Sequence, residues 1–112
     1  MERRAVATEF PQLSPKQPHY LADIRLNQDG HVAEWDSGAA TLFGYSRREA
    51  VGESFYRFLW LPDLPSGALE WQLNNAYYTG HASTRGRFVR SDRAQFSAAC
   101  EITPIWDNGF QG

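Results

Sequence analysis

The sequence predicts an α+β domain in which several short helices cover one face of an antiparallel sheet. Two parts of the chain, near residues 24 and 98, alternate apolar and polar side chains with the period of two that half-buried strands show. Between them, apolar residues recur every three or four positions, which is typical of helices with one buried face. Strands followed by helices and then by strands indicate an α+β layout.

The first two strands are expected to form a hairpin. In residues 21–26 apolar and charged side chains alternate, as in a half-buried strand. Asp29 and Gly30 follow, a pair that supplies the positive φ angles of a tight turn. Residues 31–35 then provide the second strand.

The N-terminal segment, residues 1–20, is expected to be a flexible linker or flanking segment. Three of the six prolines lie within residues 11–18, and proline fixes φ and lacks an amide donor. The chain of 112 residues is long enough for one hydrophobic core and too short for two. A single domain is therefore expected over residues 21–112.

Short helices are expected in the middle of the chain, over residues 36–44, 46–52, 55–59 and 66–79. Asp36 is placed to accept the unpaired amides of a first helical turn, and Gly44 is free to end that helix in a left-handed conformation. Ser46 and Glu49 have the spacing of a capping box. In the last stretch, Leu69, Leu73, Ala76 and Tyr77 recur at three and four, which predicts one buried face.

Two further strands are expected near the C-terminus, over residues 83–90 and 94–102. The second has the clearest strand pattern of the chain, because five apolar residues at every second position alternate with mostly polar ones. We expect one buried core that includes Leu42, Phe43, Phe58, Leu73, Phe88 and Phe96.

The composition argues against several classes of partner. Thirteen acids and 11 bases are dispersed along the chain, giving a net charge of −2, so neither nucleic acid nor an anionic membrane is an expected partner. No apolar run could span a bilayer, and the N-terminus lacks the apolar region of a secretion signal. The single cysteine, Cys100, fits a reducing compartment. A cytoplasmic location is expected.

Catalytic and metal-binding motifs are missing from the sequence. It contains no glycine-rich phosphate loop, no G-x-S-x-G, no H-E-x-x-H and no paired cysteines. His19, His31 and His81 are dispersed, which favours solvent-exposed or hydrogen-bonded side chains over metal ligands. We expect neither catalysis by this chain nor a metal site.

Several motifs nevertheless occur in a fixed order: Asp29-Gly30, Leu42-Phe43-Gly44-Tyr45-Ser46, Gly80, Arg90-Ser91-Asp92, and Asp107 with Gly109. From about Ala22 to Gly109 they resemble the PAS domains, a family of sensory and signalling modules. Arg93 departs from the pattern, since the family usually has glycine there. This turn must therefore be of another type or hold a non-glycine residue at positive φ.

The resemblance also implies a fifth strand after the Asp-Gly turn, whereas this sequence ends at Gly112. The sheet is therefore expected to lack its last strand and to leave an open edge. PAS domains often pair through their sheets and N-terminal flanks, so a homodimer is expected. Val6 and Phe10 are candidates to pack across its twofold axis.

The function implied by the resemblance is that of an input domain in a larger signalling protein. Such a domain binds a small ligand in an apolar cavity and passes the signal to an effector domain, which is a histidine kinase or a cyclic-dinucleotide enzyme such as a diguanylate cyclase. The alternative is a ligand-free dimerisation module whose own side chains fill the core. The sequence leaves both open.

The cavity, placed by the PAS layout, is expected between the sheet and the helices. Its ligand is unknown: haem, flavin, a small metabolite and no ligand all remain open. A flavin–cysteine adduct is excluded, because Phe55 and Tyr56 stand where the reactive thiol would be, and residues 66–79 offer no histidine to a haem. The expected lining residues are Ile24, Val32, Phe55, Phe58, Phe88, Phe96 and Ala98.

Overall fold

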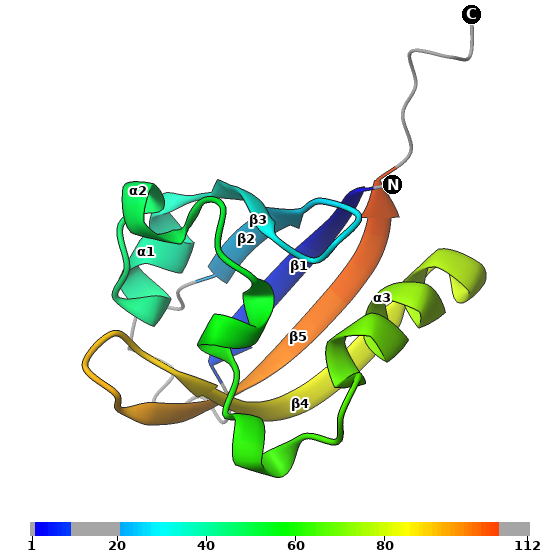
Figure 1. The fold of residues 1–112 in the computed structure, drawn as a ribbon. Coiled ribbons are helices and arrows are strands. Elements are labelled where there is room, and N and C mark those ends of the chain that lie inside the picture. Colours follow the sequence, from blue (N-terminus) through cyan, green and yellow to red (C-terminus); the bar gives the residue numbers. More distant parts are fainter. Residues whose placement is uncertain (1, 10–20, 106–112) are drawn as a thin grey trace, which may run out of the picture.

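The computed structural model describes residues 2–9 and 21–105, which form a five-stranded antiparallel sheet with helices on one face (Figure 1). The strands are β1 (Glu2–Glu9), β2 (Leu21–Leu26), β3 (Val32–Trp35), β4 (Ala82–Val89) and β5 (Gln95–Ile105). Their order across the sheet is β3-β2-β1-β5-β4. The predicted α+β class and antiparallel sheet are confirmed.

The helical segments follow one another between β3 and β4. They are α1 (Ser37–Phe43), α2 (Arg47–Ala50), the 3-10 helices η1 (Phe55–Phe58) and η2 (Leu61–Asp63), and α3 (Ala68–Thr79). In Figure 1 they lie in front of the sheet, with α1 and α2 at one end and α3 at the other. No helix of the described residues is long and apolar enough to cross a membrane.

Local capping signals place the first helices. The Asp36 carboxylate accepts the Ala39 amide at 2.8 Å, and Gly44 ends α1 with a φ of 78°. Ser46 and Glu49 form both hydrogen bonds of a capping box at the start of α2. These predicted caps are confirmed.

The N-terminal strand corrects the expectation of a flexible linker over residues 1–20. Glu2–Glu9 form β1, which pairs with β2 on one side and with β5 on the other, while residues 10–20 lie outside the described residues. Ala5 and Ala7 point to the inner face and are fully buried. The strand pattern is weak in the sequence because its core side chains are alanines, which have a low strand preference.

The position of β1 also corrects the expectation that the sheet lacks a strand. Five strands are present, and the two edges are β3 and β4. The blue strand in the middle of Figure 1 is β1, which joins the β2–β3 pair to the β4–β5 pair. The predicted open edge beside a missing strand is therefore wrong.

Aromatic rings fill the part of the core beneath α1. The ring of Phe43 lies 5.3 Å from Trp35, 5.7 Å from Phe58 and Phe88, and 5.5 Å from Phe96, measured between centroids. The six predicted core residues are all buried: Leu42, Phe43, Phe58, Leu73, Phe88 and Phe96. Tyr77, expected on the buried face of α3, is 40% exposed, which makes that assignment wrong.

The β4–β5 turn holds a non-glycine residue at positive φ, one of the two predicted outcomes. Arg93 has a φ of 71°, and its amide donates to the Arg90 carbonyl at 2.9 Å. The Ser91 amide donates to the Phe43 carbonyl at 3.0 Å. The turn is thereby fixed against the end of α1.

Candidate ligand cavity

A cavity of about 230 Å³ lies between α3, the segment from η1 to the start of α3, and the inner face of β4 and β5. Most of the side chains around it are apolar. The lining residues are Phe55, Leu59, Leu64, Ala68, Leu69, Gln72, Thr84, Arg85, Gly86, Arg87, Phe88, Cys100 and Ile102.

The lining of the cavity is exposed at Gly86. This residue alternates with Thr84 and Phe88 on the inward phase of β4, yet it is exposed. A Cβ atom at Gly86 would meet no atom within 4 Å. An inward position without neighbours means that the space beneath the strand is open at this point. The lack of a side chain at Gly86 therefore leaves this part of the lining open.

The polar side chains in the lining are those of Arg85 and Arg87, which are charged, and of Gln72 and Thr84, which are not. Gln72 comes from α3 and Thr84 from β4, and both are half-buried. Cys100, also in the lining, is 1% exposed, and burial raises its pKa to about 12, with a smaller contribution from the Glu101 charge. The thiol is therefore neutral near pH 7. These groups suit a largely apolar molecule with one or two hydrogen-bonding groups.

Tyr56 fixes the wall of the cavity where α3 begins. Its hydroxyl accepts the Leu69 amide at 3.0 Å and donates to the Glu70 carboxylate at 2.5 Å. Desolvation, followed by the hydrogen bond to Glu70, raises the pKa of Tyr56, which keeps the hydroxyl protonated as a donor. Because Gly67, the N-cap of α3, offers no side chain to cap the helix, Tyr56 takes over part of that role.

The structure brings only part of the predicted lining together. Phe55 and Phe88 line the cavity. The other five predicted residues are buried in the core but do not line it: Ile24, Val32, Phe58, Phe96 and Ala98. The prediction placed the cavity from the inward phase of the strands and the PAS layout, whereas rings of the aromatic cluster around Phe43 occupy much of that space, and the cavity lies beside α3.

Sequence reasoning missed the polar and small residues of the cavity. Gln72 follows Leu69 by three positions, on the flank of the buried helix face, and this spacing could have indicated it. Gly86 interrupts the pattern of a strand, which is a signal for open space or a close approach. Leu64 lies in an irregular segment and had no such signal.

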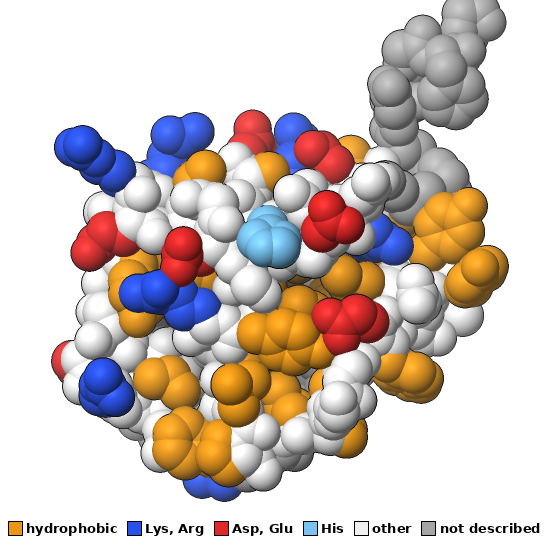
Figure 2. Space-filling model, in the orientation of Figure 1, with side chains coloured by type: hydrophobic (Ala, Val, Ile, Leu, Met, Phe, Trp, Pro, Cys, Tyr) orange, Lys and Arg blue, Asp and Glu red, His pale blue; other side chains and the backbone are white. Residues whose placement is uncertain are grey.

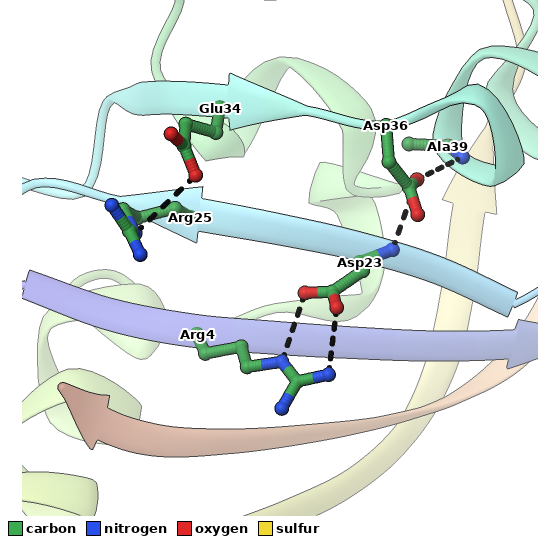
Figure 3. A network of polar contacts seen from close by, with 6 residues as sticks. All are labelled: Arg4, Asp23, Arg25, Glu34, Asp36 and Ala39. Carbon is green, nitrogen blue, oxygen red and sulfur yellow. Dashed lines mark hydrogen bonds and ion pairs between the residues drawn. The ribbon is translucent and has the colours of Figure 1, made fainter.

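The outer face of the sheet carries a second hollow, a groove of about 630 Å³. Figure 3 shows charged side chains of both signs that line it. Arg4 binds both carboxylate oxygens of Asp23, at 2.9 and 2.6 Å, and Arg25 lies 3.5 Å from Glu34. Asp36 accepts the Asp23 amide at 3.1 Å. The charges pair within the groove, so it offers no field of one sign to a charged ligand.

No group of three or more metal-ligating side chains occurs among residues 2–9 and 21–105. His31 is exposed, and His81 is exposed and lies 3.5 Å from a Glu101 carboxylate oxygen. His19 lies outside the described residues.

Comparisons with known proteins point to one fold. No model of a protein family matches the chain. It is 32% identical over 88 residues to Two-component system protein A of Emericella nidulans, in a match that covers 79% of this chain and 13% of that protein. The chain thus corresponds to about an eighth of this relative's length.

A solved structure gives the fold directly. The chain superposes on the PAS domain of a protein from Colwellia psychrerythraea with a TM-score of 0.54 and 15% sequence identity, covering 93% of this chain and 86% of that one. The five-stranded antiparallel sheet with short helices on one face agrees with this match. The chain is therefore a domain of the PAS fold.

Proposed function

We propose that this domain is the input module of a two-component signalling protein and that its cavity takes a small, largely apolar molecule. The fold and the name of the fungal relative support the first part. That name favours a two-component effector, such as a histidine kinase, over a cyclic-dinucleotide enzyme. The cavity that opens at Gly86 carries the second part.

The size of the cavity limits the ligand. A cavity of about 230 Å³ is larger than the roughly 150 Å³ apolar cavity that holds benzene. It is smaller than the roughly 300–1,000 Å³ of sites for drug-sized molecules. A single ring with one polar substituent fits this space, whereas a flavin or a haem does not.

The walls of the cavity offer a route for a signal. Cys100 and Ile102 line it from β5, the strand that pairs with β1 along its whole length. Leu64 and Leu69 line it from the opposite side, where Tyr56 holds the start of α3. A ligand between these walls would change the distance between α3 and the sheet. The β5 strand would then be displaced, because Cys100 and Ile102 contact the ligand from it.

Titration with phenol, followed by nuclear magnetic resonance of the labelled chain, tests the cavity. Phenol is expected to shift the amide signals of Leu69, Gly86 and Cys100, because it has one ring and one hydroxyl. Gly86→Leu should remove these shifts, since leucine fills the open part of the lining and the φ of Gly86 is not among the positive ones. Ser83→Leu, an exposed position on the outward phase of the same strand, is the matched control.

Loss of the phenol shifts in both variants, or their persistence in Gly86→Leu, would contradict the cavity.

The alternative function, a ligand-free dimerisation module, is favoured by the aromatic cluster around Phe43, which fills most of the core with protein side chains. An absorption scan and native mass spectrometry of the purified chain distinguish the two, because a retained small molecule supports the input module.

A further inference from the structure

A second hollow lies beside the cavity, on the outside of the segment that leads from η2 into α3. It lies at the surface and has a volume of about 420 Å³. Its walls are mostly apolar and come from Tyr56, Leu61, Leu64 and Pro65, with Glu70 at its edge. Figure 2 shows hydrophobic side chains at the surface over η1 and η2. This hollow is here called the outer hollow, and the cavity of about 230 Å³ beneath α3 the inner cavity.

The side chain of Leu64 belongs to both spaces. At the start of α3, Ala68 and Leu69 line the inner cavity. Their neighbours Gly67 and Glu70 line the outer hollow instead. Among the described residues, Leu64 is the one that lines both spaces, and it is half-buried. The wall between the inner cavity and the outer hollow is therefore closed by one leucine side chain.

The segment that carries Leu64 is attached to the domain at its two ends. At the first end, the Trp60 amide donates to the Arg87 carbonyl of β4 at 3.0 Å. At the second end, the Leu69 amide donates to the Tyr56 hydroxyl at 3.0 Å. These two hydrogen bonds hold the frame of the wall, and Leu64 lies between them.

The backbone around Leu64 is suited to movement between these ends. The Leu64 amide donates to the Leu61 carbonyl at 2.9 Å, a bond that is kept if this turn moves as a unit. Gly67, which has a φ of 79°, joins the segment to α3. A glycine changes its backbone angles at a lower cost than other residues, so Gly67 can serve as the hinge.

We propose that Leu64 is a gate that sets the size of the ligand. When Leu64 is displaced, the inner cavity and the outer hollow become one site, which takes an elongated, largely apolar molecule with one part in each space. When Leu64 is in place, the inner cavity holds a single ring. This role rests on the proposed function, because it concerns the same cavity, and it adds the residue that determines specificity.

The ligand para-phenylphenol tests the gate, because it extends phenol by a second ring. The open state is a minor one in the free domain, and the apparent affinity for a molecule that needs it is reduced by its population. If the open state is populated to about a tenth or less, Leu64→Ala should bind para-phenylphenol roughly tenfold or more tightly than the wild type. Phenol needs only the inner cavity and should gain no affinity. Nuclear magnetic resonance titration of the labelled chains measures both affinities.

The position of the bound molecule separates a gate from a mere gain of volume. In Leu64→Ala, para-phenylphenol should show nuclear Overhauser contacts with Ile102, which lines the inner cavity, and with Leu61, which lines the outer hollow. Leu59→Ala is the matched control, since Leu59 lines only the inner cavity. The same truncation there enlarges the cavity behind a closed gate, so contacts with Ile102 alone are expected.

Leu64→Met provides a second variant that keeps the volume of the side chain and therefore the fold. Because methionine is more flexible than leucine, this variant should bind para-phenylphenol more tightly than the wild type, by less than Leu64→Ala does. Equal affinities of the wild type and both Leu64 variants overturn the gate, as do contacts with Ile102 alone in Leu64→Ala, even where phenol binds the wild type. Failure of phenol to bind the wild type contradicts the proposed function instead. The gate then falls with it unless para-phenylphenol contacts both spaces in Leu64→Ala.

Discussion

Ala7 of β1 lies directly opposite Cys100 of β5 in the antiparallel register, and neither side chain is more than 1% exposed. On its other side, Ala7 lies opposite the fully buried Ala22 of β2. A row of small side chains thus crosses the middle of the sheet on its inner face. The N-terminal strand is part of the core.

Ala7→Asp is therefore expected to destabilise the domain by about 3 kcal/mol or more, because it buries a carboxylate without a partner. Thr8→Asp, at the next residue and on the outer face, should cost less than about 1 kcal/mol. Urea denaturation of both variants measures the difference. Equal stabilities would mean that Glu2–Glu9 behave as the linker that the sequence suggests.

Phe96→Ala is expected to cost about 3–5 kcal/mol of unfolding free energy, as truncation of a large aromatic in a packed core does. The ring is 6% exposed and lies 5.5 Å from Phe43 and 5.8 Å from Phe88, and the Arg90 guanidinium lies over it at 4.2 Å. A urea titration that shows a loss below about 1 kcal/mol would contradict the core assignment.

Tyr56→Phe should destabilise the domain by about 1–2 kcal/mol, since it removes the acceptor of the Leu69 amide and the donor to Glu70. Hydrogen exchange should accelerate in the first turn of α3 before the rest of the helix. Tyr78→Phe, at an 81% exposed position, is the matched control. Uniform acceleration over the whole domain would argue against a local role of Tyr56.

Cys100 should resist iodoacetamide at pH 8 until the chain unfolds, because the thiolate is the reactive form and burial raises its pKa to about 12. The raised pKa also sets the direction of a pH effect. Above pH 9.0, the ordinary pKa of a cysteine thiol, the unfolded state loses the Cys100 proton, whereas the folded state keeps it. The free energy of unfolding therefore falls as the pH rises from 9 towards 12.

The comparison with Cys100→Ala isolates this effect, because the other titrating groups are shared. The wild type should lose more stability than the variant between pH 8 and 10. Rapid alkylation of the native protein would show instead that the thiol is reached through the open part of the cavity lining.

The absorption spectrum provides a further prediction. The purified chain should be colourless, because a cavity of about 230 Å³ is smaller than sites for drug-sized ligands, which span roughly 300–1,000 Å³. A band in the visible region would require the aromatic cluster around Phe43 to rearrange around a cofactor. Absorption of the freshly purified protein, before any dialysis, decides between these outcomes.

The features that the sequence predicted correctly are those set by neighbours along the chain. The caps of α1 and α2 are formed by side chains and backbone groups within one helical turn of each other, so their spacing along the chain was sufficient to place both helices. The residues are Asp36, Gly44, Ser46 and Glu49. The positive φ of Arg93 was one of two predicted outcomes for the same reason.

The missed features depend on contacts between distant segments. The strand β1 is held by β2 and β5, and its buried alanines give little strand signal of their own. The cavity depends on which rings fill the core: Phe58 and Phe96 pack into the aromatic cluster, while Phe55 and Phe88 reach the open space. Alternation identifies inward side chains, but it cannot tell which of them face a void.

The antiparallel pairing of β1 with β5 brings Glu2 opposite Ile105, so the two ends of the described chain lie side by side (Figure 1). Tension applied between these two residues would act at the end of the ladder and open it one residue pair at a time, as a zipper opens. Peeling in this way requires less force than sliding all pairs at once. Once β1 separates from β5, no strand pairing of the sheet joins the β2–β3 hairpin to the β4–β5 hairpin. Under tension the sheet would therefore separate at its centre before its edges.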